Sequence, residues 1–220
     1  PTSMNYRYRM LLPAALAAAS FLVPGASAAE TIRNHFDTDS MMRAPGFFDL
    51  VVLGPNPAPA RWLVLADPNP VSAPNRLAQV EAKRPADSIA AAVRRTYAFE
   101  DGSVTTFVRQ GGSLAGLLLR MADEKNFLVL LADTSTGEAV LSSWRDGKPS
   151  ELGRGRVAFG KNWEKFGVVA RGASLTVTFD DRKLFEATDP HPVSGRTGLV
   201  AAGPGEASFD EFVLEFPPKS

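Results

Sequence analysis

The sequence contains no cysteine, has only two histidines, and carries no excess of charge of either sign. Without cysteine the chain can form no disulfide and has no thiol nucleophile or thiolate metal ligand. The 24 basic residues are balanced by 24 acidic ones, and basic pairs such as Arg94-Arg95 are scattered rather than clustered. A nucleic-acid partner, which selects for a concentrated basic surface, is therefore not expected.

Long hydrophobic runs are also lacking, except near the start of the chain. There, Arg7 and Arg9 precede an apolar run, Leu11 to Val23, which ends in small residues up to Ala29. This three-part pattern predicts a secretory signal peptide over residues 4–29, cleaved before Ala29 or Glu30, with residues 1–3 a remnant of cloning or translation. The run is short compared with the roughly 20 residues of a bilayer span, so no membrane span is expected after cleavage. We expect the protein to be periplasmic or secreted.

Short apolar or alternating runs separated by turn residues fill residues 30–220, which we interpret as one domain. The alternation is clearest in Ala173–Phe179, and Asp146-Gly147 has the composition of a hairpin turn. Strands are predicted at Phe47–Leu53, Arg61–Ala66, Val104–Gln110, Leu114–Met121, Phe127–Ala132, Ala139–Trp144, Phe166–Ala170, Ala173–Phe179, Gly198–Ala202 and Ser208–Phe216. So many short strands without room for crossover helices predict an all-β sandwich of two antiparallel sheets.

Other segments have weaker patterns. Three prolines make Asp67–Asn75 a loop, and Ala86–Arg95 fits either a short helix or an irregular strand. Leu117–Leu119 and Leu128–Leu131 are apolar on both faces, which predicts central strands covered on both sides. Trp62 and Trp163 lie in or beside hydrophobic strands and are assigned to the core.

Several short motifs, in this order, resemble those of one bacterial family. They are Arg61–Pro68, Ser72–Gln79, Ala115–Arg120 followed by Asp123 and Asn126-Phe127, Trp163, Val168–Gly172, Gly198-Leu199 and Phe209–Phe212. Together they resemble the exported laminin-G-like domains of the concanavalin A-like lectin/glucanase group, near the 3-keto-disaccharide hydrolase-like domains. The resemblance implies a concanavalin-like jelly roll whose concave sheet often holds glycans. The sequence departs from the family pattern at Leu128 and Leu131.

The best candidates for a ligand face are Arg120, Asp123, Asn126 and Trp144. Sugar sites combine an aromatic platform with a few fixed polar groups. The alternative is structural: Arg120 pairs with an acid, Asp123 and Asn126 shape a turn, and Trp144 packs beside its hairpin.

No cofactor is required by the sequence, but Asp37 and Asp39, before the first predicted strand, and Asp210, on the last, are candidate calcium ligands. Carboxylate oxygens suit calcium, although aspartate is also common at turns and strand ends. Calcium therefore stays an open alternative.

Glucanases of this fold carry Glu-x-Asp-x-x-Glu on one strand, and here no glutamate is followed two residues later by aspartate. No catalytic residue is assigned. The leading hypothesis is an exported, non-catalytic binding or accessory module for a carbohydrate or cell-envelope glycan. The alternatives are a glycan-active hydrolase with an unrecognised site and an accessory domain whose partner is a protein.

Overall fold

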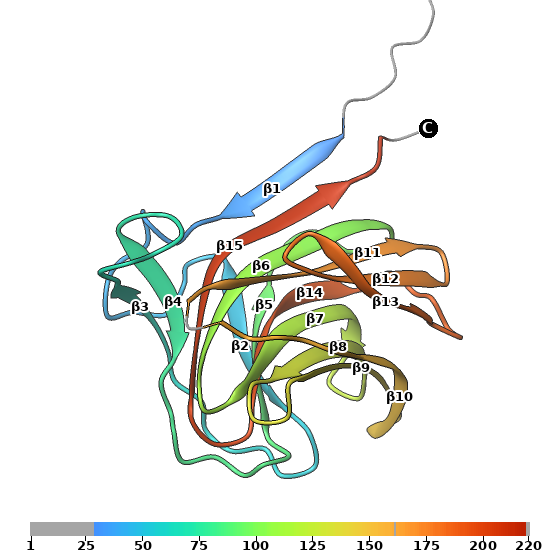
Figure 1. Cartoon of the computed structure of the whole chain (residues 1–220), viewed down its shortest axis with the longest axis horizontal. Helices are drawn as coiled ribbons and strands as arrows, with labels where there is room; N and C mark the ends of the chain where they lie inside the picture. Colours follow the sequence, from blue (N-terminus) through green and yellow to red (C-terminus); the bar gives the residue numbers. More distant parts are fainter. Residues whose placement is uncertain (1–28, 161, 219–220) are drawn as a thin grey trace, which may run out of the picture.

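Two antiparallel sheets packed face to face form the protein (Figure 1). The computed structural model describes residues 29–160 and 162–218. One sheet has the order β13-β12-β11-β6-β15-β4-β3, with β1 pairing with β15, and the other has the order β10-β9-β8-β7-β14-β5-β2. We refer to them as the eight-stranded and the seven-stranded sheet. The all-β jelly-roll expectation is confirmed.

The strand bounds are β1 Glu30–Asn34, β2 Phe48–Leu53, β3 Trp62–Ala66, β4 Asn75–Gln79, β5 Ile89–Arg94, β6 Gly102–Gly111, β7 Leu114–Asp123, β8 Asn126–Asp133, β9 Glu138–Arg145, β10 Lys148–Arg156, β11 Glu164–Arg171, β12 Ser174–Phe179, β13 Arg182–Thr188, β14 Arg196–Ala202 and β15 Glu206–Phe216. No helix that could cross a membrane occurs in the part of the chain described.

Every strand predicted from the sequence is present, and five others are not foreseen as regular strands: β1, β4, β5, β10 and β13. The residues left open between helix and irregular strand form the regular strand β5, because Ile89–Arg94 pairs on both sides, with β14 and β2. Asp146-Gly147 makes the predicted hairpin turn between β9 and β10, with φ values of 51° and 76°. Positive φ at both positions is the signature of a tight type I′ turn.

The main core lies between the sheets. Phe166, Phe209 and Leu117 are fully buried in it, and Trp62 is 2 % exposed, with its ring 5.6 Å from that of Phe209. The assignment of Trp62 to the core is confirmed. Trp163 is a correction: it is only half-buried, and Arg109 stacks on its ring with 4.5 Å from guanidinium carbon to centroid.

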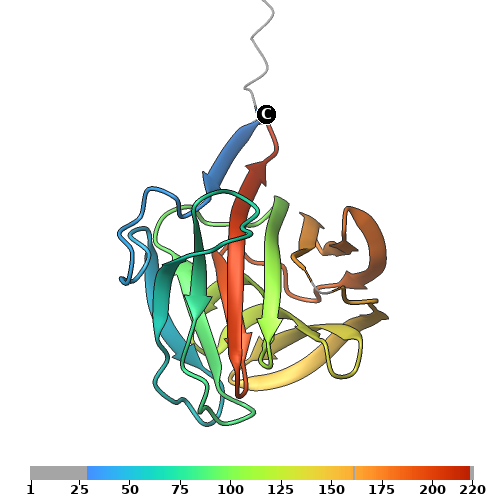
Figure 2. The same ribbon diagram turned by 60° about the vertical axis from the view of Figure 1, so that its left-hand side comes forward.

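The two ends of the described chain lie side by side. Strand β1 pairs with the last residues of β15, and this pair extends beyond the rest of the sandwich (Figure 2). The predicted signal peptide falls on residues 4–29, and all of these except Ala29 lie outside the described residues.

Candidate functional site

A second apolar cluster covers the outer face of the seven-stranded sheet. It contains ten buried residues, among them Leu118, Val129 and Val200, none more than 4 % exposed. The half-buried Leu114, Leu131 and Trp144 pack against it from outside. These residues come from β2, β5, β7, β8, β9 and β14, which explains why the sequence of β7 and β8 is apolar at consecutive positions.

Two adjoining recesses open on this face, and they share Leu114 and Leu131 as a common wall. The apolar recess, about 420 Å³, is lined by Pro55, Ala86, Asp87, Ile89, Leu114, Leu131, Trp144, Gly147, Lys148, Pro149 and Ala202. The polar recess, about 290 Å³, is lined by Leu114, Val129, Leu131, Asp133, Thr136, Glu138, Val140, Ser142 and Arg154. We call the two recesses together the groove.

An aromatic stack supports the apolar recess. Trp144 on β9 lies directly across from Phe127 on β8, and the two rings are stacked with centroids 5.4 Å apart and 15° between their planes. Because Phe127 is fully buried, it holds the half-buried indole of Trp144 in place as one wall of the recess.

Charged groups gather in the polar recess. Arg154 Nη1 lies 3.0 Å from Glu138 Oε2, and Arg154 also binds Glu151 outside the recess. Burial raises the pKa of Asp133, but hydrogen bonds donated by Ser135 and Thr136 together outweigh it and hold the pKa below its usual value. With the Arg154 side chain 54 % exposed, this set offers both charged donors and acceptors to a ligand.

The structure places Arg120 in the interior instead of on a ligand face, which corrects the expectation that its side chain projects near the glycan-binding sheet. Its side chain has no exposed surface, and it pairs with Asp189, also fully buried, at 2.9 Å. It donates to the carbonyls of Glu100 and Gly172 at 2.7 and 2.6 Å. The cause is a β-bulge: Arg120 has φ 49°, and the register of β7 against β8 shifts after Leu119.

Two of the other three candidates for a ligand face, Asp123 and Asn126, are bonded to each other in a turn. Asp123 accepts from the backbone N–H of Lys125 at 2.7 Å and from Asn126 Nδ2 at 2.9 Å, and Asn126 in turn accepts from the N–H of Asp146. These bonds shape the β7–β8 turn and tie it to the β9–β10 turn. Trp144 alone among the four candidates lines the groove.

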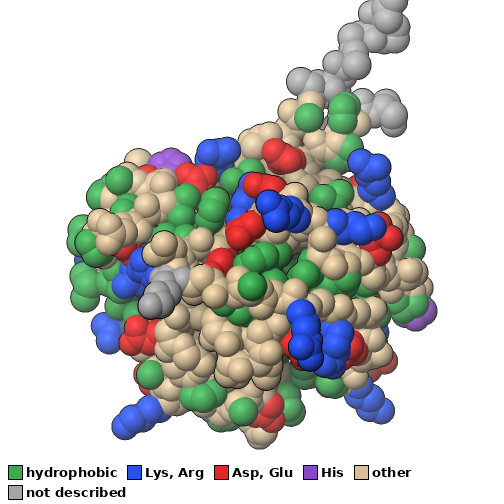
Figure 3. Space-filling view, viewed as in Figure 1, with side chains coloured by type: hydrophobic (Ala, Val, Ile, Leu, Met, Phe, Trp, Pro, Cys, Tyr) green, Lys and Arg blue, Asp and Glu red, His purple; other side chains and the backbone are tan. Residues whose placement is uncertain are grey.

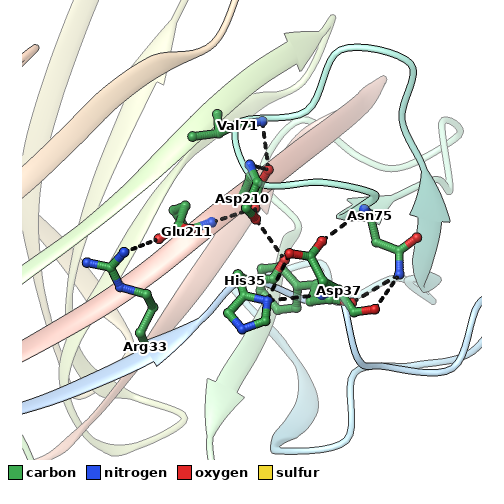
Figure 4. Close-up of polar contacts among 9 residues, drawn as sticks. Arg33, His35, Asp37, Val71, Asn75, Asp210 and Glu211 are labelled. Carbon is green, nitrogen blue, oxygen red and sulfur yellow. Dashed lines mark hydrogen bonds and ion pairs between the residues drawn. The ribbon is translucent and has the colours of Figure 1, made fainter.

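The candidate calcium ligands Asp37 and Asp210 are each engaged in hydrogen bonds with neighbouring groups (Figure 4). The oxygens of Asp210 accept four hydrogen bonds, from the backbone N–H groups of Val71, Ser72 and Glu211 and from Ser72 Oγ. Asp37 accepts from the N–H of Asn75, and Asp39 binds Gly46. Among the residues described, no group of three metal-ligating side chains occurs. A carboxylate already surrounded by donors does not fit calcium, which needs six to eight oxygen ligands.

A hydrolase would need a carboxylic acid kept protonated beside its substrate. Burial raises the pKa of Glu164 on β11 and of Asp210 on β15, both in the eight-stranded sheet. Neither lines the groove, and the groove carboxylate with a shifted pKa, Asp133, has the shift in the opposite direction.

Charge of either sign is dispersed over the surface in view in Figure 3, where basic and acidic side chains lie next to each other. Ion pairs such as Lys165–Asp181 and Arg33–Glu211 occur in the structure. The even mixture on this face agrees with the balanced composition.

Sequence reasoning missed most of the groove. Arg154 and Glu138 lie on β10 and β9, and Leu131, noted only as a departure from a family pattern, forms the wall between the recesses. The available signal was the doubly apolar run Leu128–Leu131, which indicated that both faces of β8 pack against something.

No family model and no curated protein matches the sequence. Solved structures do match the fold. A galectin-like protein of unknown function from Bacillus subtilis has a TM-score of 0.57 at 13% identity, with 89% of this chain and 99% of that one covered. The GH16 protein of the Bacteroides ovatus mixed linkage glucan PUL has a TM-score of 0.56 at 11% identity, with 84% and 99% covered.

The carbohydrate-binding module CBM66 from Bacillus subtilis has a TM-score of 0.55 at 15% identity, with 70% of this chain and 94% of that chain covered. At such low identities the likeness concerns the fold alone. The chain is therefore similar in architecture to galectin-like, GH16 and CBM66 jelly rolls, which is consistent with the concanavalin-like lectin/glucanase fold.

Proposed function

We propose that the protein is a non-catalytic carbohydrate-binding module whose ligand lies in the groove. The observation that carries the proposal is the placement of an aromatic wall, Trp144, and a charged donor–acceptor set, Arg154 with Glu138, in two recesses that share a wall. Sugars present apolar C–H faces together with hydroxyls, so their sites pair aromatic rings with a few oriented polar groups.

The fold comparisons support this proposal in a general way. Among the similar architectures are a carbohydrate-binding module and a galectin-like protein. The absence of a Glu-x-Asp-x-x-Glu sequence and the lowered pKa of Asp133 favour binding over hydrolysis.

Binding should be weak, with Kd between about 10⁻⁶ and 10⁻³ M, because few polar groups orient the ligand in an open groove. A glycan array followed by calorimetry on each hit tests the proposal. Trp144→Ala should weaken binding at least tenfold, while Trp163→Ala, which alters a half-buried tryptophan outside the groove, should leave it unchanged. If no glycan binds, or if both variants behave alike, the proposal is wrong.

We also propose that the protein acts outside the cytoplasm, on the strength of the N-terminal sequence from Arg7 to Ala29. Mass spectrometry of protein expressed with residues 4–220 should find a mature start at Ala29 or Glu30 in the periplasmic or extracellular fraction. Soluble protein that retains Met4 would contradict export.

A second candidate function, a module that binds another protein, is favoured by a different surface. Met41, Met42 and Phe47, between β1 and β2, are 52, 62 and 58 % exposed. Exposed apolar side chains close together in the sequence are typical of contact surfaces. A Met41→Ser, Met42→Ser, Phe47→Ser triple variant should lose such a partner and keep every glycan, whereas Trp144→Ala should do the reverse.

A further inference from the structure

Apart from the exposed Asp87 and Lys148, the side chains that line the apolar recess offer little that a sugar hydroxyl could use. Its floor comes from β5, β7, β8 and β14, whose backbone groups are paired within the sheet, and the side chains there are those of Ile89, Leu114, Leu131 and Ala202. A hydroxyl placed on this floor would lose its hydrogen bonds to water without replacement, which is unfavourable. The recess therefore selects for methylene, methyl or aryl groups.

The polar recess is mixed in character, because aliphatic side chains such as Val129 and Val140 line it together with charged ones. Arg154, Glu138 and Asp133 present a guanidinium and two carboxylates around a smaller volume. A saccharide can use both kinds of surface, since its hydroxyls hydrogen-bond to the charged groups while its C–H faces pack on the aliphatic side chains, whereas an alkyl chain would use only the second.

The recesses are contiguous, because Leu114 and Leu131 line both. A single ligand that fills the groove must therefore be apolar at one end and polar at the other. Trp144 stands at the apolar end, on the β9 strand that also supplies Glu138 and Ser142 to the polar end.

We infer that the natural ligand is an amphiphilic glycan, a saccharide that carries an alkyl or acyl chain, with the sugar in the polar recess and against Trp144, and the chain over the aliphatic side chains of the apolar recess. This inference rests on the proposed function and narrows it. It assigns Leu131 to chain binding and Arg154 to sugar binding.

Calorimetry with alkyl β-glucosides and alkyl β-galactosides from methyl to octyl, below their micelle concentrations, tests the inference. Affinity should rise about fourfold for each added methylene until the recess is filled, since each buried methylene contributes about that factor. The 1-alkanol of the same length, which lacks the sugar, should bind at least tenfold more weakly.

Variants separate the two ends. Leu131→Asp should abolish the dependence on chain length, and Arg154→Ala should weaken the glycosides toward the level of the alkanols. Thr105→Asp, on the outer face of the eight-stranded sheet, should change neither the dependence of affinity on chain length nor the affinity for the glycosides. Leu131→Thr, a milder change, should flatten the dependence if Leu131→Asp does not fold, with melting curves recorded for each variant.

The possible results distinguish the inference from the proposed function. If affinity does not depend on chain length while array sugars bind through Trp144, the inference is overturned and the carbohydrate module stands. If alkanols bind as tightly as glycosides, the groove does not recognise the sugar, and both the inference and the proposed function are overturned. If no alkyl glycoside binds, the inference is overturned, and the array result decides the proposed function.

Discussion

The outer faces of the two sheets differ in chemistry although both belong to the same sandwich. On strand β6 of the eight-stranded sheet, buried Val104 and Val108 alternate with the half-buried Thr105 and Phe107, so that this strand is closed to water on its inner side only. On the seven-stranded sheet, Leu118 and Val129 face outward and are 0 and 2 % exposed. An apolar outer face is unfavourable in water unless it binds a ligand or a partner, and the groove on this face is the proposed binding site.

Placing a charge on each outer face gives the largest expected contrast. Leu118→Asp should lower the free energy of unfolding by at least about 4 kcal/mol, because it removes a buried side chain and buries an unpaired charge. Thr105→Asp, on the eight-stranded sheet, should cost less than about 1 kcal/mol. Urea denaturation of both variants measures the difference, and equal losses would mean that the two faces are equally solvated.

Arg120 marks the point where the regular alternation of β7 is interrupted. Arg120→Ala should lower the free energy of unfolding by about 3–5 kcal/mol, because the buried carboxylate of Asp189 would lose one of its two arginine partners. Arg145→Ala removes the other arginine that binds Asp189, through a side chain that is 26 % exposed, and should cost less. A loss below about 1 kcal/mol for Arg120→Ala would show that this interior pair contributes little.

Two aspartates, one from each sheet, should affect the free energy of unfolding in opposite ways as the pH changes. Burial raises the pKa of Asp210 in the folded state. The contribution of Asp210 to the free energy of unfolding is therefore complete below its usual pKa of 3.8 and is lost as pH rises through the folded-state pKa. The pKa of Asp133 is lowered in the folded state. Its contribution to the free energy of unfolding is therefore complete above the usual pKa of 3.8 and is lost as pH falls through the folded-state pKa.

Urea titrations from about pH 3 to about pH 7 on Asp210→Asn and Asp133→Asn test this pair. The advantage of the wild type over Asp133→Asn should grow as pH rises, and its advantage over Asp210→Asn should shrink. Parallel curves for the two variants would contradict the assigned directions.

Calcium should have the smallest effect. Because the oxygens of Asp210 already accept four hydrogen bonds, millimolar calcium should leave the Tm unchanged, and chelator should have no effect. A rise in Tm by mass action that Asp210→Asn removes would instead restore the calcium interpretation of Asp37, Asp39 and Asp210.

The sequence predicts those elements whose pattern is set by burial. Runs such as Leu114–Met121 are strands because they pack on one or both faces, and they correspond to β7 and its neighbours. The strands β10 and β13 are missed because they are sheet edges with many polar residues, where alternation is weak. Edge strands carry little information about their own burial.

The site is harder to predict for geometric reasons. The outward or inward direction of Arg120 depends on one bulge, and its partner Asp189 is 69 residues away in the sequence. Likewise, Arg154 reaches the groove only because β10 pairs with β9 in a particular register, Arg154 opposite Val140. Trp144 was foreseen because an aromatic residue among polar ones indicates a platform by its type alone.

The side chain of Arg120 also constrains how the protein unfolds. It extends from the seven-stranded sheet to the carbonyl of Gly172, in the β11–β12 turn of the eight-stranded sheet, and to the carbonyl of Glu100 before β6. Because one guanidinium joins the two sheets, neither can separate from the other while these bonds persist. Amide hydrogens of β7 and β11 should therefore exchange with solvent at one common rate, that of global unfolding, rather than through independent local openings.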